Sequence, residues 1–159
     1  PALTSTKRSD ETGITVSGVK RHGYNTEGFV FEDLTIKGTP AQWATIAVQA
    51  YHKYNANYII IESNVGGDTL THTIHSIDRN VTVKLHHASK SKRLRAEPIS
   101  ILYEKEAVHH VGKFDKLEEQ MCSFDDDSDF SPDRLDSVCM GLTELMLTGP
   151  GAMQGHFTL

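Results

Sequence analysis

The amino-acid sequence predicts a single α/β domain in which helices flank a mixed β-sheet. The chain has 159 residues, of which 38% are hydrophobic, and this is enough to bury one sizeable core. Two β-rich segments come first, and segments with helical and strand-like patterns then follow in turn. We expect residues 1–147 to form the domain and residues 148–159, which are rich in glycine, to be a flexible tail.

The first half of the chain is predicted to begin with a hairpin and a helix. Residues 13–19 and 29–36 are β-rich and are separated by a turn region with glycine and asparagine, which favours an antiparallel hairpin. Thr39 is a suitable cap for a helix whose first residue is Pro40. One face of this helix carries the apolar residues Trp43, Ile46, Ala47, Ala50, Tyr51 and Tyr54.

A buried strand at residues 58–61 and a glycine loop at Gly66 and Gly67 come next. A second helix is expected after the loop, and Val81, Val83 and Leu85 then alternate as another strand. In mixed α/β sheets, ligands bind beyond the carboxyl ends of the strands. Glu62 follows the buried strand and is therefore placed where a ligand would bind.

The second half of the chain is predicted to be mainly helical. Residues 93–103 favour a helix despite Pro98, residues 108–111 a short edge strand, and residues 116–122 another helix. The last helix is expected over residues 132–147, with a buried side of leucine, valine, cysteine and methionine.

Charge and cysteine content restrict the class of protein. The formal net charge of -5 argues against a wholly basic nucleic-acid binder, although residues 84–95 are basic and residues 125–129 acidic. Cys122 and Cys139 form no C-x-x-C motif, so neither a disulfide framework nor a zinc knuckle is expected. The sequence shows neither an apolar run of the ~18 residues of a membrane span nor a signal peptide. We expect a cytosolic protein without a membrane partner.

Three acids stand at positions that suit a metal ion. Glu62 ends a buried strand, and Asp133 and Asp136 are neighbours on one face at the start of a helix. Glu62 is also explained as a solvated strand end and Asp133 as an acid serving the helix dipole, whereas Asp136 is half-buried and needs a partner or a metal. Mg²⁺ takes oxygen ligands and usually one or two protein carboxylates. The pattern favours a metal-dependent phosphodiester enzyme.

Other metal sites fit the sequence less well. Six side chains occupy the ligand positions of a twelve-residue calcium loop: Asp125, Asp127, Asp129, Ser131, Asp133 and Asp136. Phe130 replaces the glycine of the sharp turn and Pro132 interrupts the loop, so a mobile acidic loop is favoured. The pairs His72 and His75, and His109 and His110, lack a third ligand at zinc spacing, and surface or structural roles are expected.

A basic tract lies between the last predicted strand of the first half and the next helix. Its residues Lys90, Lys92, Arg93 and Arg95 either form a solvated surface or bind the phosphates of a polyanionic substrate beside the metal site. The chain has no G-x-x-x-x-G-K-[ST] loop for ATP, no G-x-S-x-G elbow and no plausible cysteine nucleophile.

An ordered set of short motifs resembles the nuclease domain of the large terminase subunit of tailed bacteriophages and prophages. The motifs are DETGI at residues 10–14, TPAQWA at 39–44, ESNVGGD at 62–68, KRLRAEP at 92–98 and SPDRLD at 131–136. The resemblance implies an RNase H-like fold and an endonuclease that uses two Mg²⁺ or Mn²⁺ ions to cut concatemeric double-stranded viral DNA. It also implies an N-terminal packaging ATPase in the same polypeptide, portal and small terminase subunit as partners, and the cytoplasm of the bacterial host as location.

The resemblance assigns roles to individual residues. Glu62 matches the acid of the central strand, Asp136 the acid of the C-terminal helix, and Asp133 an accessory position one turn earlier. The family's first acid ends a first strand and is usually followed by proline, which here would be Pro1. We therefore expect a fragment of a longer polypeptide that lacks this strand, with Asp10 at best an auxiliary ligand. The alternatives are another RNase H-like nuclease of the junction resolvase type and a non-catalytic DNA-binding module.

Overall fold

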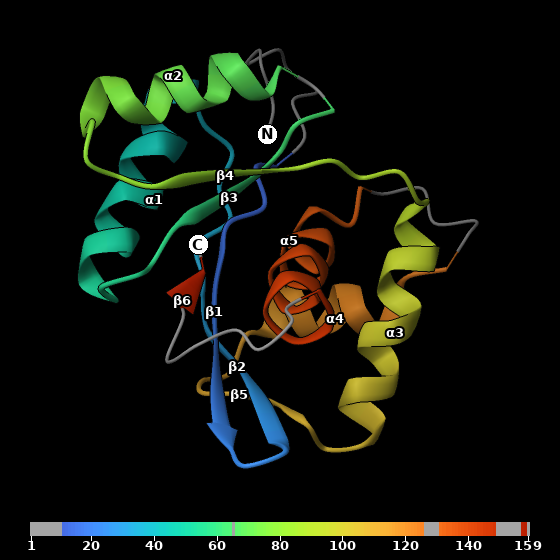
Figure 1. Cartoon of the computed structure of the whole chain (residues 1–159). Coiled ribbons are helices and arrows are strands. Elements are labelled where there is room, and N and C mark those ends of the chain that lie inside the picture. The colour runs from blue at the N-terminus through green and yellow to red at the C-terminus, as the bar shows by residue number, and fades with distance from the viewer. Residues whose placement is uncertain (1–10, 65, 126–130, 149–156, 159) are drawn as a thin grey trace.

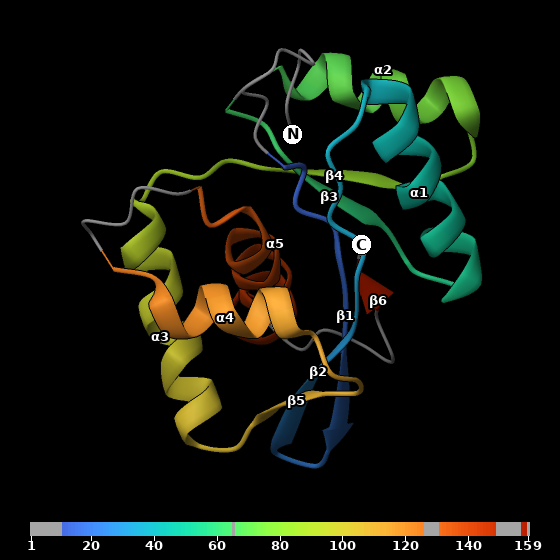
Figure 2. The same ribbon diagram turned by 180° about the vertical axis from the view of Figure 1, so that it is seen from behind.

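Helices and strands of the chain are arranged in two groups on either side of a long hairpin. The computed structural model describes residues 11–64, 66–125, 131–148 and 157–158 (Figure 1). Strands β3 (Ile59–Glu62) and β4 (Val83–His86) lie with helices α1 (Pro40–Lys53) and α2 (Gly67–Ile77) in one group (Figures 1 and 2). Helices α3 (Lys92–Glu104), α4 (Asp115–Ser123) and α5 (Asp133–Leu142) form the other group. Strand β1 (Thr15–His22) runs between the two groups.

The larger sheet is built on the predicted hairpin. Strands β1 (Thr15–His22) and β2 (Asn25–Asp33) pair antiparallel, and the turn between them contains Gly23 at a φ of 57°, which suits glycine. Strand β5 (Val108–His110) lies parallel to β2 at the edge, as expected for residues 108–111. Strand β6 (Phe157–Thr158) pairs with Ser17 and Gly18 of β1, so the sheet is mixed, with the order β5-β2-β1-β6.

A second, parallel sheet consists of two strands. Strand β3 (Ile59–Glu62) pairs with β4 (Val83–His86), and Glu62 stands opposite His86 at the end of the register. The three isoleucines of β3 are buried, which confirms the prediction of a strand covered on both faces. In β4, by contrast, Leu85 is exposed.

The helices occupy the regions expected from the sequence. They are α1 (Pro40–Lys53), α2 (Gly67–Ile77), α3 (Lys92–Glu104), α4 (Asp115–Ser123) and α5 (Asp133–Leu142). Thr39 and Gln42 form a reciprocal capping box at the start of α1, and Pro40 is the first helical residue, as predicted. The last helix was expected to be continuous to residue 147, but α5 is followed by a π-helical turn, η1 (Thr143–Leu147).

Two clusters of buried apolar side chains stabilise the two groups. The first joins the start of β1 to α1, β3 and α2 through residues such as Val16, Trp43, Ile59, Ile61 and Ile74. The second joins β2 and β5 to α3, α4 and α5 through residues such as Val30, Ile99, Val108, Leu117 and Leu142. Among the described residues, none of the helices has the length and apolar character needed to cross a bilayer.

Candidate active site

Glu62 is held at the carboxyl end of β3 by contacts between the loops that follow β3 and β4. The backbone N–H of Ser63 donates to the carbonyl of His86 at 2.9 Å. The Asn64 side chain donates to the carbonyl of Ala88 at 2.6 Å and accepts from its N–H at 3.2 Å. The chain then turns through Gly66 at a φ of 69° into α2. These contacts fix the direction in which the Glu62 side chain leaves the sheet.

Asp136 lies in the first turn of α5, and the start of this helix is fastened to its surroundings. The side-chain carbonyl of Gln120, on α4, accepts from the backbone N–H groups of Arg134 and Leu135 at 3.1 and 3.3 Å. This contact replaces the missing side-chain cap at Pro132. The hydroxyl groups of Thr15, on β1, and Ser137 are hydrogen-bonded at 2.9 Å.

A buried arginine adds a second anchor for α5. Nη1 of Arg134 donates to Asp33 Oδ2 at 2.5 Å and Nη2 donates to Glu11 Oε2 at 2.9 Å. Gly13 passes close to the same turn, because a Cβ added there would lie 2.0 Å from the Asp133 carbonyl oxygen. The first turn of α5 therefore sits directly against the start of β1, and Asp136 has little freedom to move with its helix.

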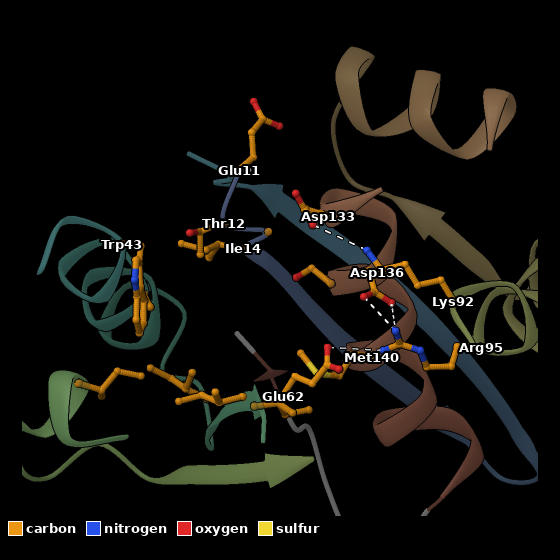
Figure 3. Close-up of a pocket in the computed structure, with 17 residues that line it drawn as sticks. Glu11, Thr12, Ile14, Trp43, Glu62, Lys92, Arg95, Asp133, Asp136 and Met140 are labelled. Carbon is orange, nitrogen blue, oxygen red and sulfur yellow. Dashed lines mark hydrogen bonds and ion pairs between the residues drawn. The ribbon is translucent and has the colours of Figure 1, made fainter. Parts of the chain in front are cut away.

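The guanidinium of Arg95, on α3, lies between the Glu62 and Asp136 carboxylates (Figure 3). Nη2 is 3.0 Å from Asp136 Oδ1 and 3.1 Å from Oδ2, and Nη1 is 3.7 Å from Glu62 Oε2. The structure thus brings together the two acids expected at the strand end and the helix start. Their roles as metal ligands stay predictions.

Burial dominates the electrostatics of Asp136, whose side chain is 15% exposed. Burial raises the pKa of this carboxyl, the positive charges of Arg95 and Lys92 oppose the rise, and the charge of Glu62 adds to it. An additional cation near this carboxylate would favour its ionised form.

Asp133 lies at the rim of the same site. Its Oδ1 accepts a hydrogen bond from the Ser131 hydroxyl at 2.7 Å, and Lys92 Nζ is 3.9 Å away. Lys92 also donates to the Ser131 hydroxyl at 3.1 Å. Asp133 therefore faces the cavity from the same helix as Asp136. It contacts Ser131 and Lys92, whereas Asp136 contacts Arg95.

A cavity of about 200 Å³ extends from these acids between β3 and residues 11–14, which lead into β1. One end is charged, with Glu62, Lys92, Arg95, Asp133 and Asp136, and the remaining walls are mostly apolar. The apolar walls include Ile14, Trp43, Ala47, Ile59, Ile60, Ile61, Ile74 and Met140. Trp43 is 3% exposed, and within the described part of the chain its indole Nε1 has no hydrogen-bond partner.

The expected basic tract does not form one surface. Lys90 is exposed, Lys92 contacts the rim of the acid site, and Arg95 points into it. Arg93 lines a different cavity, of about 440 Å³, together with Tyr103 and Cys139. In that cavity burial raises the pKa of the Cys139 thiol to about 12, which agrees with the absence of a cysteine nucleophile from the sequence analysis.

Glu62 and Asp136 offer carboxylate oxygens, the ligands that a hard divalent cation prefers. The two acids come from two rigid elements, and the positive charge of Arg95 already lies between them. No group of three or more His, Cys, Asp or Glu side chains suited to a metal occurs among the described residues. Asp10, the expected auxiliary ligand, and most of the acidic segment of the calcium-loop alternative lie outside the described residues.

The comparison with protein families gives a single clear result. A family model described as the terminase RNaseH-like domain matches residues 1–145. The chain belongs to this family. This confirms the resemblance inferred from the sequence and, with the mixed α/β architecture, the expected fold class. Neither the curated proteins nor the solved structures searched include a match.

Membership in the terminase RNaseH-like family supports a nuclease-type role for the domain. Sequence reasoning missed two features of its acid site, namely the position of Arg95 between the acids and the anchoring of α5 by Arg134. Arg134 pairs with residues more than 100 positions earlier in the chain, so no local pattern marks it. Arg95 was expected to bind DNA phosphates together with its basic neighbours in sequence.

Proposed function

We propose that this domain is the metal-dependent endonuclease of a viral DNA-packaging terminase and that it cuts concatemeric double-stranded DNA in the cytoplasm of the bacterial host. The proposal rests on one observation: the carboxylates of Glu62 and Asp136 both contact the Arg95 guanidinium at the end of a cavity. Family membership supports the nuclease-type role. The N-terminal packaging ATPase of the same polypeptide, the portal and the small terminase subunit are the proposed partners.

In this proposal Glu62 and Asp136 hold the metal ions, with Asp133 and Asp10 as accessory acids. Two Mg²⁺ or Mn²⁺ ions, when bound, would activate a water molecule and stabilise the oxygen that leaves. The protein contributes rigid positions for the acids, because β3 and the start of α5 are both held by several hydrogen bonds. No side chain is required as a nucleophile.

Positive side chains at the start of α3 and just before it are proposed to orient the DNA. Lys90, Lys92 and Arg93 are proposed to contact phosphates, which favours cleavage with little sequence preference. Lys92 already lies beside Asp133, so a phosphate bound by Lys92 would be close to the acids.

We also propose that one further extended segment of the full polypeptide completes the domain between β1 and β3. Among the described strands, β3 pairs with β4 alone, and β1 pairs with β6 only at Ser17 and Gly18. The apolar cavity lies between β3 and residues 11–14, which lead into β1, and the Trp43 Nε1 in its wall has no partner among the described residues. A strand with apolar side chains would fill the cavity, and an acid at its carboxyl end would join Glu62 and Asp136.

Nicking of supercoiled plasmid tests the function. With roughly ten upstream residues that end in an acid, a length typical of a strand with its connection, the domain should nick plasmid in Mg²⁺ or Mn²⁺ but not in EDTA. Glu62→Gln and Asp136→Asn should each remove the activity, and Glu104→Gln, at the exposed end of α3, should keep it. Metal-dependent nicking that survives both acid substitutions would overturn the proposed site. Full nicking by residues 1–159 alone would overturn the proposed additional segment.

A further inference from the structure

We propose that Arg95 is a built-in counter-cation that positions Glu62 and Asp136 and that a divalent ion must displace to enter the site. This inference rests on the proposed metal-dependent function, because it concerns the same two acids. It assigns to Arg95 a positioning role in the metal-free protein, in place of the phosphate-binding role expected from its basic neighbours.

The geometry shows a guanidinium that is enclosed but incompletely bonded. The Arg95 side chain is 13% exposed, and its Nη2 contacts both oxygens of Asp136. The contact from Nη1 to Glu62 is 3.7 Å, which is an ion pair but too long for a good hydrogen bond. Within the described part of the chain, Nε and Nη1 are buried without a hydrogen-bond partner. A buried donor without a partner is costly, so Arg95 is held here mainly by charge.

The charges explain why some cation must be present. Glu62 and Asp136 come from β3 and α5, two elements whose positions are fixed by other contacts, so the carboxylates can separate only by rotation of their side chains. Without a positive charge between them, the two partly buried carboxylates would repel one another. Arg95 supplies that charge in the metal-free protein.

The same charges make Arg95 and a divalent ion mutually exclusive. A metal ion bound by oxygens of both Glu62 and Asp136 would occupy the region that the guanidinium fills, and the two cations would repel each other strongly in a partly buried site. The Arg95 side chain has several rotatable bonds, so its guanidinium can turn away from the acids while α3 stays in place. Metal binding therefore includes the energetic cost of breaking the Arg95 contacts.

Metal affinity distinguishes this role from a merely structural one. Binding of Mn²⁺, followed by electron paramagnetic resonance of the free ion, should be about tenfold tighter for Arg95→Met than for the unaltered domain, which corresponds to about 1.4 kcal/mol. In EDTA the melting temperature of Arg95→Met should fall, and saturating Mn²⁺ should restore it more than it raises that of the unaltered domain. Arg79→Met, which removes the same charge at an exposed position after α2, should leave the affinity for Mn²⁺ unchanged.

A second substitution covers the case in which Arg95→Met does not fold. Arg95→Lys keeps the positive charge but replaces the planar guanidinium, which can donate from two nitrogens at once, with a single ammonium group. Its affinity for Mn²⁺ should therefore lie between those of the unaltered domain and Arg95→Met. A folded Arg95 variant that binds Mn²⁺ no more tightly than the unaltered domain would overturn the proposal while leaving the proposed function intact. If neither the unaltered domain nor the variants bind Mn²⁺, both the counter-cation role and the proposed metal-dependent function fail.

Discussion

Two arginines in this domain each lie between two carboxylates, yet their surroundings differ. Arg134, 5% exposed, donates to Asp33 at 2.5 Å and to Glu11 at 2.9 Å. Arg95 lies 3.0 Å from the Asp136 carboxylate and 3.7 Å from that of Glu62. Its Nε and Nη1 have no hydrogen-bond partner among the described residues. The first arginine donates a hydrogen bond to each of its two acids, whereas the second is hydrogen-bonded to Asp136 and only ion-paired with Glu62.

We interpret the Arg134 contacts as a structural ion cluster and, under the proposal above, the Arg95 contacts as a site that exchanges its cation. Arg134 joins α5 to β2 and to Glu11, and Gly13 allows the same helix turn to approach β1. That cluster fixes where Asp136 stands. Arg95 then occupies the space that Asp136 and Glu62 define, and its contacts are the ones that a competing cation would break. At the anchor the arginine is hydrogen-bonded to both acids, whereas at the candidate active site one of the two contacts is a longer ion pair.

The largest effect is expected at the anchor. Arg134→Met should lower the free energy of unfolding by about 3–5 kcal/mol, because it leaves the buried Asp33 carboxylate without its partner. Urea denaturation measures this change. Arg79→Met, at an exposed arginine after α2, is the control and should stay within about 0.5 kcal/mol. A loss below about 1 kcal/mol for Arg134→Met, as for a surface ion pair, would remove the contrast between the two arginines.

A smaller loss is expected where α5 meets β1. Gly13→Ala would place a Cβ 2.0 Å from the Asp133 carbonyl oxygen and 2.7 Å from its carbon, and both are backbone atoms that cannot turn aside. We expect Gly13→Ala to lower the free energy of unfolding by roughly 1–3 kcal/mol. Gly141→Ala, in the same helix, meets nothing closer than 3.5 Å and should be neutral or stabilising by up to about 1 kcal/mol. Equal stability of the two variants would show that α5 is not pressed against β1.

Local signals in the sequence were sufficient for most elements and for the positions of the two acids. Thr39 and Pro40 predicted the start of α1, and the isoleucine run before Glu62 predicted β3, because capping residues and apolar runs act within a few positions. Asp136 was identified because an acid beside core-facing residues is unusual.

Long-range pairings were beyond the reach of local patterns. Arg95 meets an acid 41 positions later, and Arg134 meets one 101 positions earlier. Strand β6 was not expected at all, because its two residues pair with β1 from a segment predicted to be a flexible tail. A basic stretch and a glycine-rich tail describe composition, whereas these contacts depend on how distant segments meet.

The smallest effect is expected at Glu118, a carboxylate whose contacts are with His110 and Phe114 and not with Arg95 or Arg134. Glu118, whose side chain is 40% exposed, accepts from the backbone N–H of Phe114 at 3.2 Å and contacts Nδ1 of His110 at 3.0 Å. The hydrogen bond with His110, followed by that with Phe114, lowers the pKa of Glu118 below its usual 4.5.

The sign of the pH dependence at Glu118 follows from this lowered pKa. The stabilisation should be complete above about pH 4.5 and be lost as the pH falls through the lower pKa of the folded protein. Glu118→Gln should cost less than about 1 kcal/mol at neutral pH, and unfolding curves of the two proteins should converge on acidification. A difference that grows in acid would contradict the assignment.

The central claim is that Glu62 and Asp136 are the metal-binding acids and that Arg95 gives way to the metal. A crystal structure of the domain in Mn²⁺, with anomalous scattering to locate the ion, tests this most directly. We predict an anomalous peak in contact with oxygens of both Glu62 and Asp136, with the Arg95 guanidinium turned away from them. Mn²⁺ bound elsewhere, with Arg95 still lying between the two carboxylates at full occupancy, would contradict the claim.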